Sequence, residues 1–220
     1  MWFLLALIAL VCWSGSDLFS KIGSKPDDKF SQWKMVVAVG LVMGVHAIVE
    51  IVFFKVPFSL KAMWTYLPAS LCYISSMFIG YIGLRYIELS ISSPICNTSG
   101  AFASLFLIVF FTDRAGIESQ TQLIMTIVGI IVCALGVTGL GFAEMSEDDE
   151  IRARRQETAN VKYSKSWLAL AIPVIYCFID AAGTVADSFI LDVLDEDVAN
   201  VAYELTFLPV SYTHLTLPTI

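Results

Sequence analysis

The segments WFLLALIALVCW (residues 2–13) and WLALAIPVIYCF (residues 167–178) decide the fold that this sequence predicts. Laid on one another, they share Trp, Leu, Ala and Cys at four of twelve positions, and most other positions are aliphatic or aromatic. Many membrane transporters consist of two repeats of opposite orientation, which leave weak internal similarity of this kind. The pair indicates that residue 167 begins a second copy of the unit that starts at residue 2.

The composition indicates that the chain lies in a lipid bilayer. Of its 220 residues, 57% are hydrophobic and 15% are charged, and the mean hydropathy is +0.76. Soluble globular proteins carry about 25% charged residues. Much of the net charge of −7 comes from the acidic runs at residues 147–150 and 192–197, and the basic stripe typical of a nucleic-acid-binding protein is not seen. We expect an integral membrane protein with no nucleic-acid partner.

Six apolar stretches are long enough to cross a bilayer. A hydrocarbon core of about 30 Å needs roughly 20 residues of helix, because lipid cannot satisfy free backbone polar groups. The stretches are residues 2–22, 33–54, 63–87, 91–111, 123–142 and 167–191, and a seventh begins near residue 198. Five spans precede residue 167, and an odd number inverts the second copy relative to the first.

The chain divides into two helical units joined by a charged linker. The first stretch has neither a positively charged start nor a small-x-small cleavage pattern, so we expect a retained helix rather than a signal peptide. The charges of residues 143–166 alternate in blocks and predict a solvated linker. The predicted domains are therefore a five-helix repeat at residues 1–142, the linker, and the start of a second repeat at residues 167–209.

The distribution of Lys and Arg predicts an orientation. With the loops assigned alternately to the two sides of the membrane, ten of these residues fall on one side and three on the other. The ten are Lys21, Lys25, Lys29, Lys34, Arg85, Arg152, Arg154, Arg155, Lys162 and Lys165, and the three are Lys55, Lys61 and Arg114. The count favours a cytoplasmic linker and an N-terminus outside.

Four segments of the chain carry a recognisable pattern of helix order and small-residue placement. They are CWSGSDLFSKIG in the first span, GYIGLRYIELSISSP after the third, NTSGAFASLFLIVFFTDR in the fourth and IVGIIVCALGVTGLGF in the fifth. Together they resemble the EamA-type domain of the drug/metabolite transporter superfamily. The resemblance implies two five-helix repeats, ten spans in all, around a central substrate cavity. The chain departs from the family in its outside N-terminus and in Thr112-Asp113-Arg114, where the family often has Gly-Glu-Arg.

The last eleven residues, VSYTHLTLPTI at 210–220, do not continue the seventh span. A ten-helix protein would extend that span past Pro209, and this Thr-rich string predicts no membrane helix. Its first ten residues match the translation of one reading frame of a tagmentation sequencing adapter. We expect a truncated chain with an adapter-derived end, and exclude residues 210–220, with His214, from the fold prediction. A natural tail is the alternative.

Ionisable groups inside spans are the main candidates for function, because they are costly in lipid and usually face a cavity or a partner. In the first span Trp13, Asp17 and Lys21 follow one another at a spacing of four and share a face. Asp17 either binds substrate or a proton beside the aromatic wall of Trp13, or it pairs with Lys21 near the membrane surface. The two interpretations stay open.

A polar stripe runs along the sixth span. Tyr176, Asp180, Gly183, Thr184 and Asp187 recur at helical spacing. This pattern is typical of a helix that lines a water-filled path. Asp187 lies near the acidic run at the surface, so Asp180 is the stronger candidate for binding substrate or a proton, and Tyr176 for the cavity wall.

The fourth span opens with SISSPICNTSG, which is rich in hydroxyl and amide groups. Pro94 frees a backbone carbonyl upstream, while Asn97 and Thr98 supply donors and acceptors. This combination suits a polar, substrate-binding cavity wall or a gate. For the serines of the segment, helix packing is the favoured interpretation.

The second span carries two further patterns. His46 and Glu50 stand one turn apart and predict either a proton relay or, preferably, an interfacial pair near Lys55. Gly40 and Gly44 form a G-x-x-x-G, which ordinarily indicates close helix packing. The glycines of the fifth span are also expected to serve packing: Gly129, Gly136, Gly139 and Gly141.

These patterns favour a secondary transporter of small organic solutes or metabolites that works by alternating access in the plasma (inner) membrane. The expected partners are a small-molecule substrate and the bilayer, with a homodimer left open. The first alternative is a non-transporting scaffold that oligomerises through Gly40 and Gly44. An intramembrane aspartyl enzyme is less favoured, because the segment GTVAD at residues 183–187 lacks a Gly-x-Gly-Asp, so we do not expect an enzyme.

No cofactor or metal is expected. The chain has no P-loop sequence, and its five cysteines contain no C-x-x-C pair. The cysteines fall in separate apolar runs, which argues against disulfides or a zinc site. Coupling to protons or other cations stays open.

Overall fold

The computed structural model describes residues 2–25, 28–145 and 168–216, and every regular element in these ranges is helical. The elements are α1 (Trp2–Gly23), α2 (Ser31–Val49), the π-helical turn η1 (Glu50–Phe54), α3 (Leu60–Tyr86), α4 (Leu89–Cys96), α5 (Ser99–Phe110), the short 3-10 helix η2 (Thr112–Arg114), α6 (Gln120–Met145), α9 (Leu168–Ile190) and α10 (Glu196–Thr216). Nearly all of the predicted linker, from residue 146 onward, lies outside the described residues.

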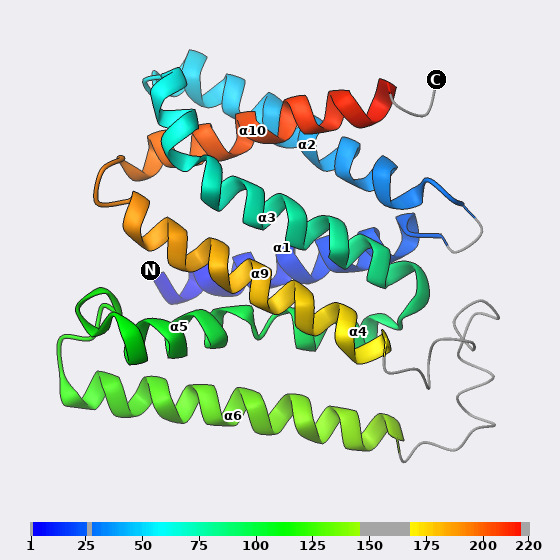
Figure 1. Cartoon of the computed structure of the whole chain (residues 1–220), viewed down its shortest axis with the longest axis vertical. Helices are drawn as coiled ribbons and strands as arrows, with labels where there is room; N and C mark the ends of the chain where they lie inside the picture. Colours follow the sequence, from blue (N-terminus) through cyan, green and yellow to red (C-terminus); the bar gives the residue numbers. More distant parts are fainter. Residues whose placement is uncertain (1, 26–27, 146–167, 217–220) are drawn as a thin grey trace.

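Six helical stretches are long and apolar enough to cross a membrane, which confirms the six predicted spans. They are Phe3–Gly23, Ser31–Phe54, Leu60–Tyr86, Leu89–Phe110, Gln120–Leu140 and Ala171–Ile190. In Figure 1 the connections drawn within the described residues lie alternately at the two ends of the bundle. The helix α10, which carries three carboxylates, is not among the six stretches found in the described part of the chain. The protein is therefore an all-helical membrane protein.

The outer helices α1 and α6 present apolar side chains to their surroundings. On α1 the exposed fractions of Leu5 and Val11 are 63% and 71%, and on α6 those of Met125 and Leu135 are 68% and 67%. Soluble proteins rarely expose apolar surfaces of this extent. These faces suit contact with lipid tails, which are as apolar as the side chains themselves.

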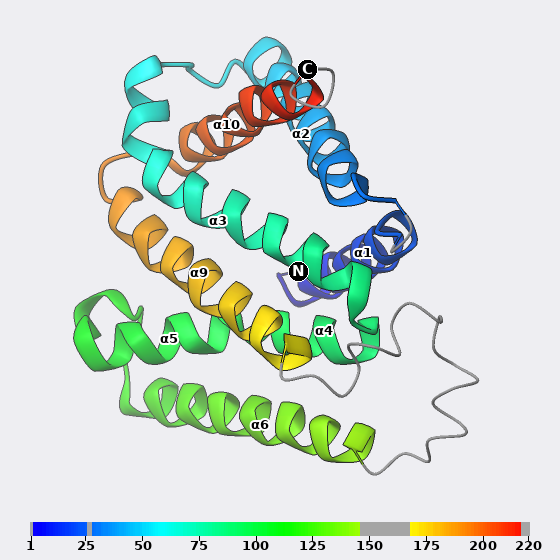
Figure 2. The same cartoon turned by 45° about the vertical axis from the view of Figure 1, so that its right-hand side comes forward.

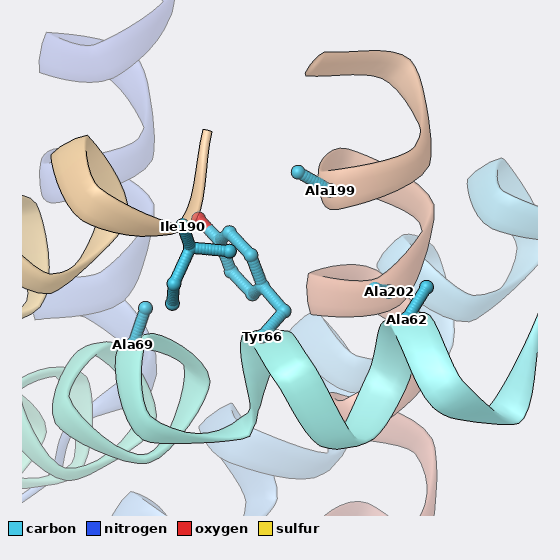
Figure 3. Packing of buried hydrophobic residues seen from close by; sticks show 6 residues of the cluster. All are labelled: Ala62, Tyr66, Ala69, Ile190, Ala199 and Ala202. Carbon is cyan, nitrogen blue, oxygen red and sulfur yellow. The ribbon is translucent and has the colours of Figure 1, made fainter. Parts of the chain in front are cut away.

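Small residues allow α3, α9 and α10 to approach closely. Figure 3 shows Tyr66 of α3 rising towards Ile190 at the end of α9, with Ala199 and Ala202 of α10 on the other side. Together with Ala62 and Ala69 these residues form one buried cluster. Alanine at such contacts lets helix backbones come together, and dispersion forces then hold the helices in place.

The second helix packs along α10. Gly40 and Gly44 of α2 are buried, and a Cβ added to Gly44 would lie 2.4 Å from Cγ of Leu208. Figure 2 shows α2 beside α10 and α3 beside α9. The G-x-x-x-G thus serves close packing, as predicted, and its partner is a helix of the same chain.

The fourth span is broken where the sequence suggested one continuous helix from residue 91 to 111. The helix passes through Pro94 without a break and then stops at Asn97, three residues downstream. The Asn97 amide donates to the carbonyl of Ser93 (2.9 Å), and the Thr98 hydroxyl donates to that of Ile95 (2.6 Å). Such side-chain bonds compete with the helical backbone pattern, which explains the position of the break.

The last helix also differs from expectation. The sequence suggested that helix ends near Pro209, but α10 continues to Thr216 with Pro209 inside it. A proline removes one backbone donor and can kink a helix without ending it. The side chains from residue 210 onward lie outside the described part of the chain.

Candidate functional site

A cavity of about 530 Å³ lies inside the bundle. Its walls come from α1, α2, α3, α4, α9 and α10, so both predicted units contribute to it. Five of the six predicted site residues line it: Trp13, Asp17, Asn97, Tyr176 and Asp180. The structure therefore brings together residues that are separated by as many as 167 positions in the sequence.

The first carboxylate of the cavity is Asp17 on α1. The Ser93 hydroxyl of α4 donates a hydrogen bond to its Oδ2 atom. The Asn97 amide in turn donates to Ser93 Oγ at 3.0 Å. Asn97 therefore acts on Asp17 through Ser93, a serine for which the sequence favoured simple helix packing.

The neighbouring lysine has other hydrogen-bond partners. Lys21 donates to the carbonyl oxygens of Leu84 (2.7 Å) and Ile87 (3.0 Å), at the C-terminal end of α3. A cation at this end of a helix is favourable, because the last carbonyls have no partner within the helix. Of the two interpretations of Asp17, the geometry thus favours the carboxylate in a cavity over a simple pair with Lys21.

The second carboxylate is Asp180 near the middle of α9. Ser76 Oγ of α3 lies 3.0 Å from Asp180 Oδ1 and 2.9 Å from the carbonyl oxygen of Tyr73, so these two acceptors share its single hydrogen. Ser76 is completely buried. The sequence patterns did not single out this residue, although two consecutive serines in the apolar third span could have indicated it.

The polar stripe of α9 serves two purposes. Tyr176 and Asp180 line the cavity, but Gly183, Thr184 and Asp187 do not. The Tyr73 hydroxyl donates to Thr184 Oγ1 (3.3 Å), and the Tyr66 hydroxyl donates to Asp187 Oδ1 (2.6 Å). A Cβ added to Gly183 would lie 3.1 Å from the Tyr73 ring. The prediction that the whole stripe lines a water-filled path is therefore wrong, because its outer half packs against α3.

The sixth predicted site residue, Thr98, does not line the cavity. Besides donating to the carbonyl of Ile95, its hydroxyl lies 3.6 Å from the sulfur of Cys177. The Cys177 thiol, which is fully buried, also donates to Ile95 O at 2.7 Å. Thr98 and Cys177 thus both donate hydrogen bonds to the Ile95 carbonyl at the break between α4 and α5. They support the cavity wall without lining it.

Aromatic side chains form much of the remaining wall. Tyr66, Tyr73, Tyr81 and Tyr203 join the predicted Trp13 and Tyr176 in lining the cavity. Tyr73 and Tyr203 meet edge to face, with ring centroids 5.4 Å apart. The faces of such rings attract cations, as the two carboxylates do. These tyrosines were missed because tyrosines in an apolar span have many structural uses, and the sequence does not reveal which of them share one cavity.

Comparison with protein-family models, with curated proteins and with solved structures gives no match to this chain. The aspartates, hydroxyl donors and aromatic rings of the cavity are therefore the features that indicate a function.

Proposed function

We propose that this protein is a secondary transporter of small organic solutes and that its cavity favours a solute that carries a positive charge. The observation that carries the proposal is the cavity itself, where Asp17 and Asp180 from two different helices face one space among aromatic rings. Ionisable residues within membrane spans usually mark a substrate or ion pathway. On this proposal the two aspartates bind the cationic group of the solute or the proton that drives transport.

The size of the cavity supports a small organic solute. Ligand pockets in proteins typically enclose about 300–1,000 Å³, and the present cavity has about 530 Å³. An amino acid, an amine or a nucleoside-like molecule fits such a volume. The aromatic side chains would hold its apolar part, while the aspartates and Asn97 give its polar groups partners.

The arrangement of helices supports alternating access. In transporters with inverted repeats, the substrate site lies between the repeats, and one repeat rocks against the other. The cavity here has walls from the predicted first repeat and from the start of the second. In addition α2 packs along α10, the second helix of each predicted unit. Two helices related by a two-fold axis contact each other when they lie next to that axis, so the contact of α2 with α10 agrees with an inverted repeat.

The experiment is transport by the purified protein in lipid vesicles. We expect uptake of amines or other cationic solutes, tested beside amino acids and nucleosides with and without a proton gradient. Asp17→Asn and Asp180→Asn should each lower the rate at limiting solute about ten- to hundredfold, because a hydrogen bond to a charged group contributes about 1.5–3 kcal/mol. Asp113→Asn, an exposed carboxylate outside the cavity, is the matched control and should transport normally.

Two results would reject the proposal. One is that no solute moves under any gradient while the protein remains folded and monodisperse. The other is that both asparagine variants transport as well as the unchanged protein. A non-transporting scaffold instead predicts no transport and a function that both asparagine replacements leave unchanged. It is less favoured because Gly44 contacts Leu208 within the chain.

A further inference from the structure

Three side chains of types that can bind a metal ion form a cluster outside the cavity, where α2 meets α10. His46 and Glu50 come from α2 and the start of η1, and Glu204 comes from α10. Nδ1 of His46 lies 2.9 Å from Glu204 Oε2 and 4.0 Å from Glu50 Oε1. One ligand atom from each of the three residues lies within 4.8 Å of the others.

The charges of this cluster do not balance. Only 17% of the Glu50 side chain and 12% of the Glu204 side chain are exposed. In the described part of the chain, the ion pairs of these two carboxylates are both with His46. A protonated imidazole neutralises one carboxylate, so one negative charge remains near lipid, where an uncompensated charge is costly.

One oxygen of the cluster also lacks a partner. Glu50 Oε2 is buried and has no hydrogen-bond partner among the described residues. A buried carboxylate oxygen without a partner loses its hydration and gains nothing in return. The helix also widens into a π-helical turn at Glu50, and such turns are frequent at functional sites.

We propose that His46, Glu50 and Glu204 bind a divalent transition-metal cation, for which Zn²⁺ is the test ion. A neutral imidazole and two carboxylates supply one nitrogen and at least two oxygen ligands, and their charge of −2 matches that of the ion. Zinc binds these groups at about 2.0–2.2 Å and accepts three protein ligands with water in the fourth position.

The site joins the two predicted units. His46 is the most exposed of the three residues, with 56% of its side chain exposed. Two ligands lie before the linker and the third lies after it, so the ion would fasten α2 to α10. The proposal does not depend on transport, because none of the three ligands lines the cavity.

The experiment is zinc binding by the complete chain in detergent, stripped of metal beforehand and followed by calorimetric titration. We expect one zinc ion per chain and a higher unfolding temperature when zinc is present. His46→Gln, Glu50→Gln and Glu204→Gln should each weaken zinc binding at least about tenfold, because even residues that only support metal ligands contribute that much. In each variant, zinc should raise the unfolding temperature less.

Two control variants show whether zinc binds at this cluster or elsewhere on the chain. His214→Gln removes the other histidine of the sequence and should leave zinc binding unchanged. Asp17→Asn should also bind zinc normally, whether or not it transports, so the failure of one proposal can be told from the failure of the other. The metal site is refuted if the three glutamine variants bind zinc as tightly as the unchanged protein. It is equally refuted if Mg²⁺ displaces zinc at similar concentrations, since imidazole ligands favour zinc over Mg²⁺.

Discussion

At the scale of single residues, three aspartates of the spans each receive a hydrogen bond from a hydroxyl on another helix. Ser93 donates to Asp17, Ser76 lies within reach of Asp180, and Tyr66 donates to Asp187. A charged side chain at the centre of a membrane helix costs about 2.5–3.5 kcal/mol on insertion scales. These hydroxyl groups replace part of the water that each carboxylate gives up in the membrane.

The pair of Tyr66 and Asp187 offers a test of this arrangement. Tyr66→Phe and Asp187→Asn should each lower the free energy of unfolding by about 1–3 kcal/mol. The first substitution leaves the Asp187 carboxylate without this donor, and the second replaces the charged acceptor by a weaker neutral one. The double variant should lose less than the sum of the single losses, since the two residues act as one unit. The measurement is chemical unfolding in detergent micelles. Additive losses would show that the hydrogen bond contributes nothing to stability.

The aspartates could be predicted from the sequence, but their partners could not. A carboxylate in an apolar run is conspicuous, so the sequence by itself indicates Asp17 and Asp180 as candidates. Ser76 and Ser93 resemble ordinary small residues of a membrane helix. Their importance depends on which helix faces which, and that information is not local. Whether the aspartates bind substrate stays a prediction.

At the scale of helices, close contact is confined to particular glycines. A Cβ on Gly44, Gly80, Gly83 or Gly183 would lie 2.4–3.1 Å from the nearest atom of a neighbouring side chain, depending on the position. By contrast nothing lies within 4 Å of a Cβ on Gly129, Gly136 or Gly139 of α6. The packing role expected for these three glycines is therefore not seen in this structure, and they lie on a helix that largely faces its surroundings.

This contrast gives a matched pair of substitutions. Gly44→Ala places a methyl group against Leu208, so we expect the free energy of unfolding to fall by about 1–3 kcal/mol through overpacking. Gly129→Ala adds the same methyl group in open space and should be neutral or slightly stabilising, because alanine favours helix. Thermal unfolding of both variants in one detergent checks the difference. Equal unfolding temperatures would mean that α2 and α10 do not pack as closely as described.

Helix positions were predictable, while the interruption of the fourth span was only partly so. Each span is recorded in the sequence as a run of apolar residues of fixed minimum length, so the six spans were found within a few residues. Pro94 suggested a weak point, but the break lies at Asn97, where side chains bind the backbone. A proline in the sequence does not by itself reveal the residue at which side-chain hydrogen bonds replace the helical backbone pattern.

At the scale of the whole molecule, the six spans place alternate loops on opposite sides of the membrane. The connections from α1 to α2 and from α3 to α4 lie at one end of the bundle, and those from α2 to α3, α5 to α6 and α9 to α10 lie at the other (Figure 1). The first end carries most of the Lys and Arg residues of the described part. The positive-inside rule therefore predicts that this end faces the cytoplasm.

Cysteine labelling tests this topology. In a variant whose five native cysteines are replaced, Lys25→Cys and Glu88→Cys should react with a membrane-impermeant maleimide only after the cells are opened. Pro57→Cys, Glu118→Cys and Asp195→Cys should react in intact cells. The reverse result would keep the six spans but invert the orientation, as the resemblance to the EamA-type domain implies. Labelling of both groups from one side would contradict the six-span arrangement.

The class of the molecule could be read from its composition, but its internal symmetry could not be established in the same way. Four identities in twelve apolar residues suggested an inverted repeat. The contact of α2 with α10 agrees with that suggestion without deciding it. The resemblance to the EamA-type domain likewise stays a prediction, because helix order and small residues form a diffuse pattern that many membrane bundles share.

The attachment of α1 has a mechanical consequence. Near its C-terminal end, Lys21 donates to two carbonyl oxygens of the α3 terminus, while most of the helix before it is exposed. Trp13 lies eight residues from Lys21, or about 12 Å along a helix that rises about 1.5 Å per residue. A tilt of about 10° around this attachment would carry the indole sideways by about 2 Å. A change in the hydrogen bonds of Lys21 would therefore change the width of the cavity at Trp13.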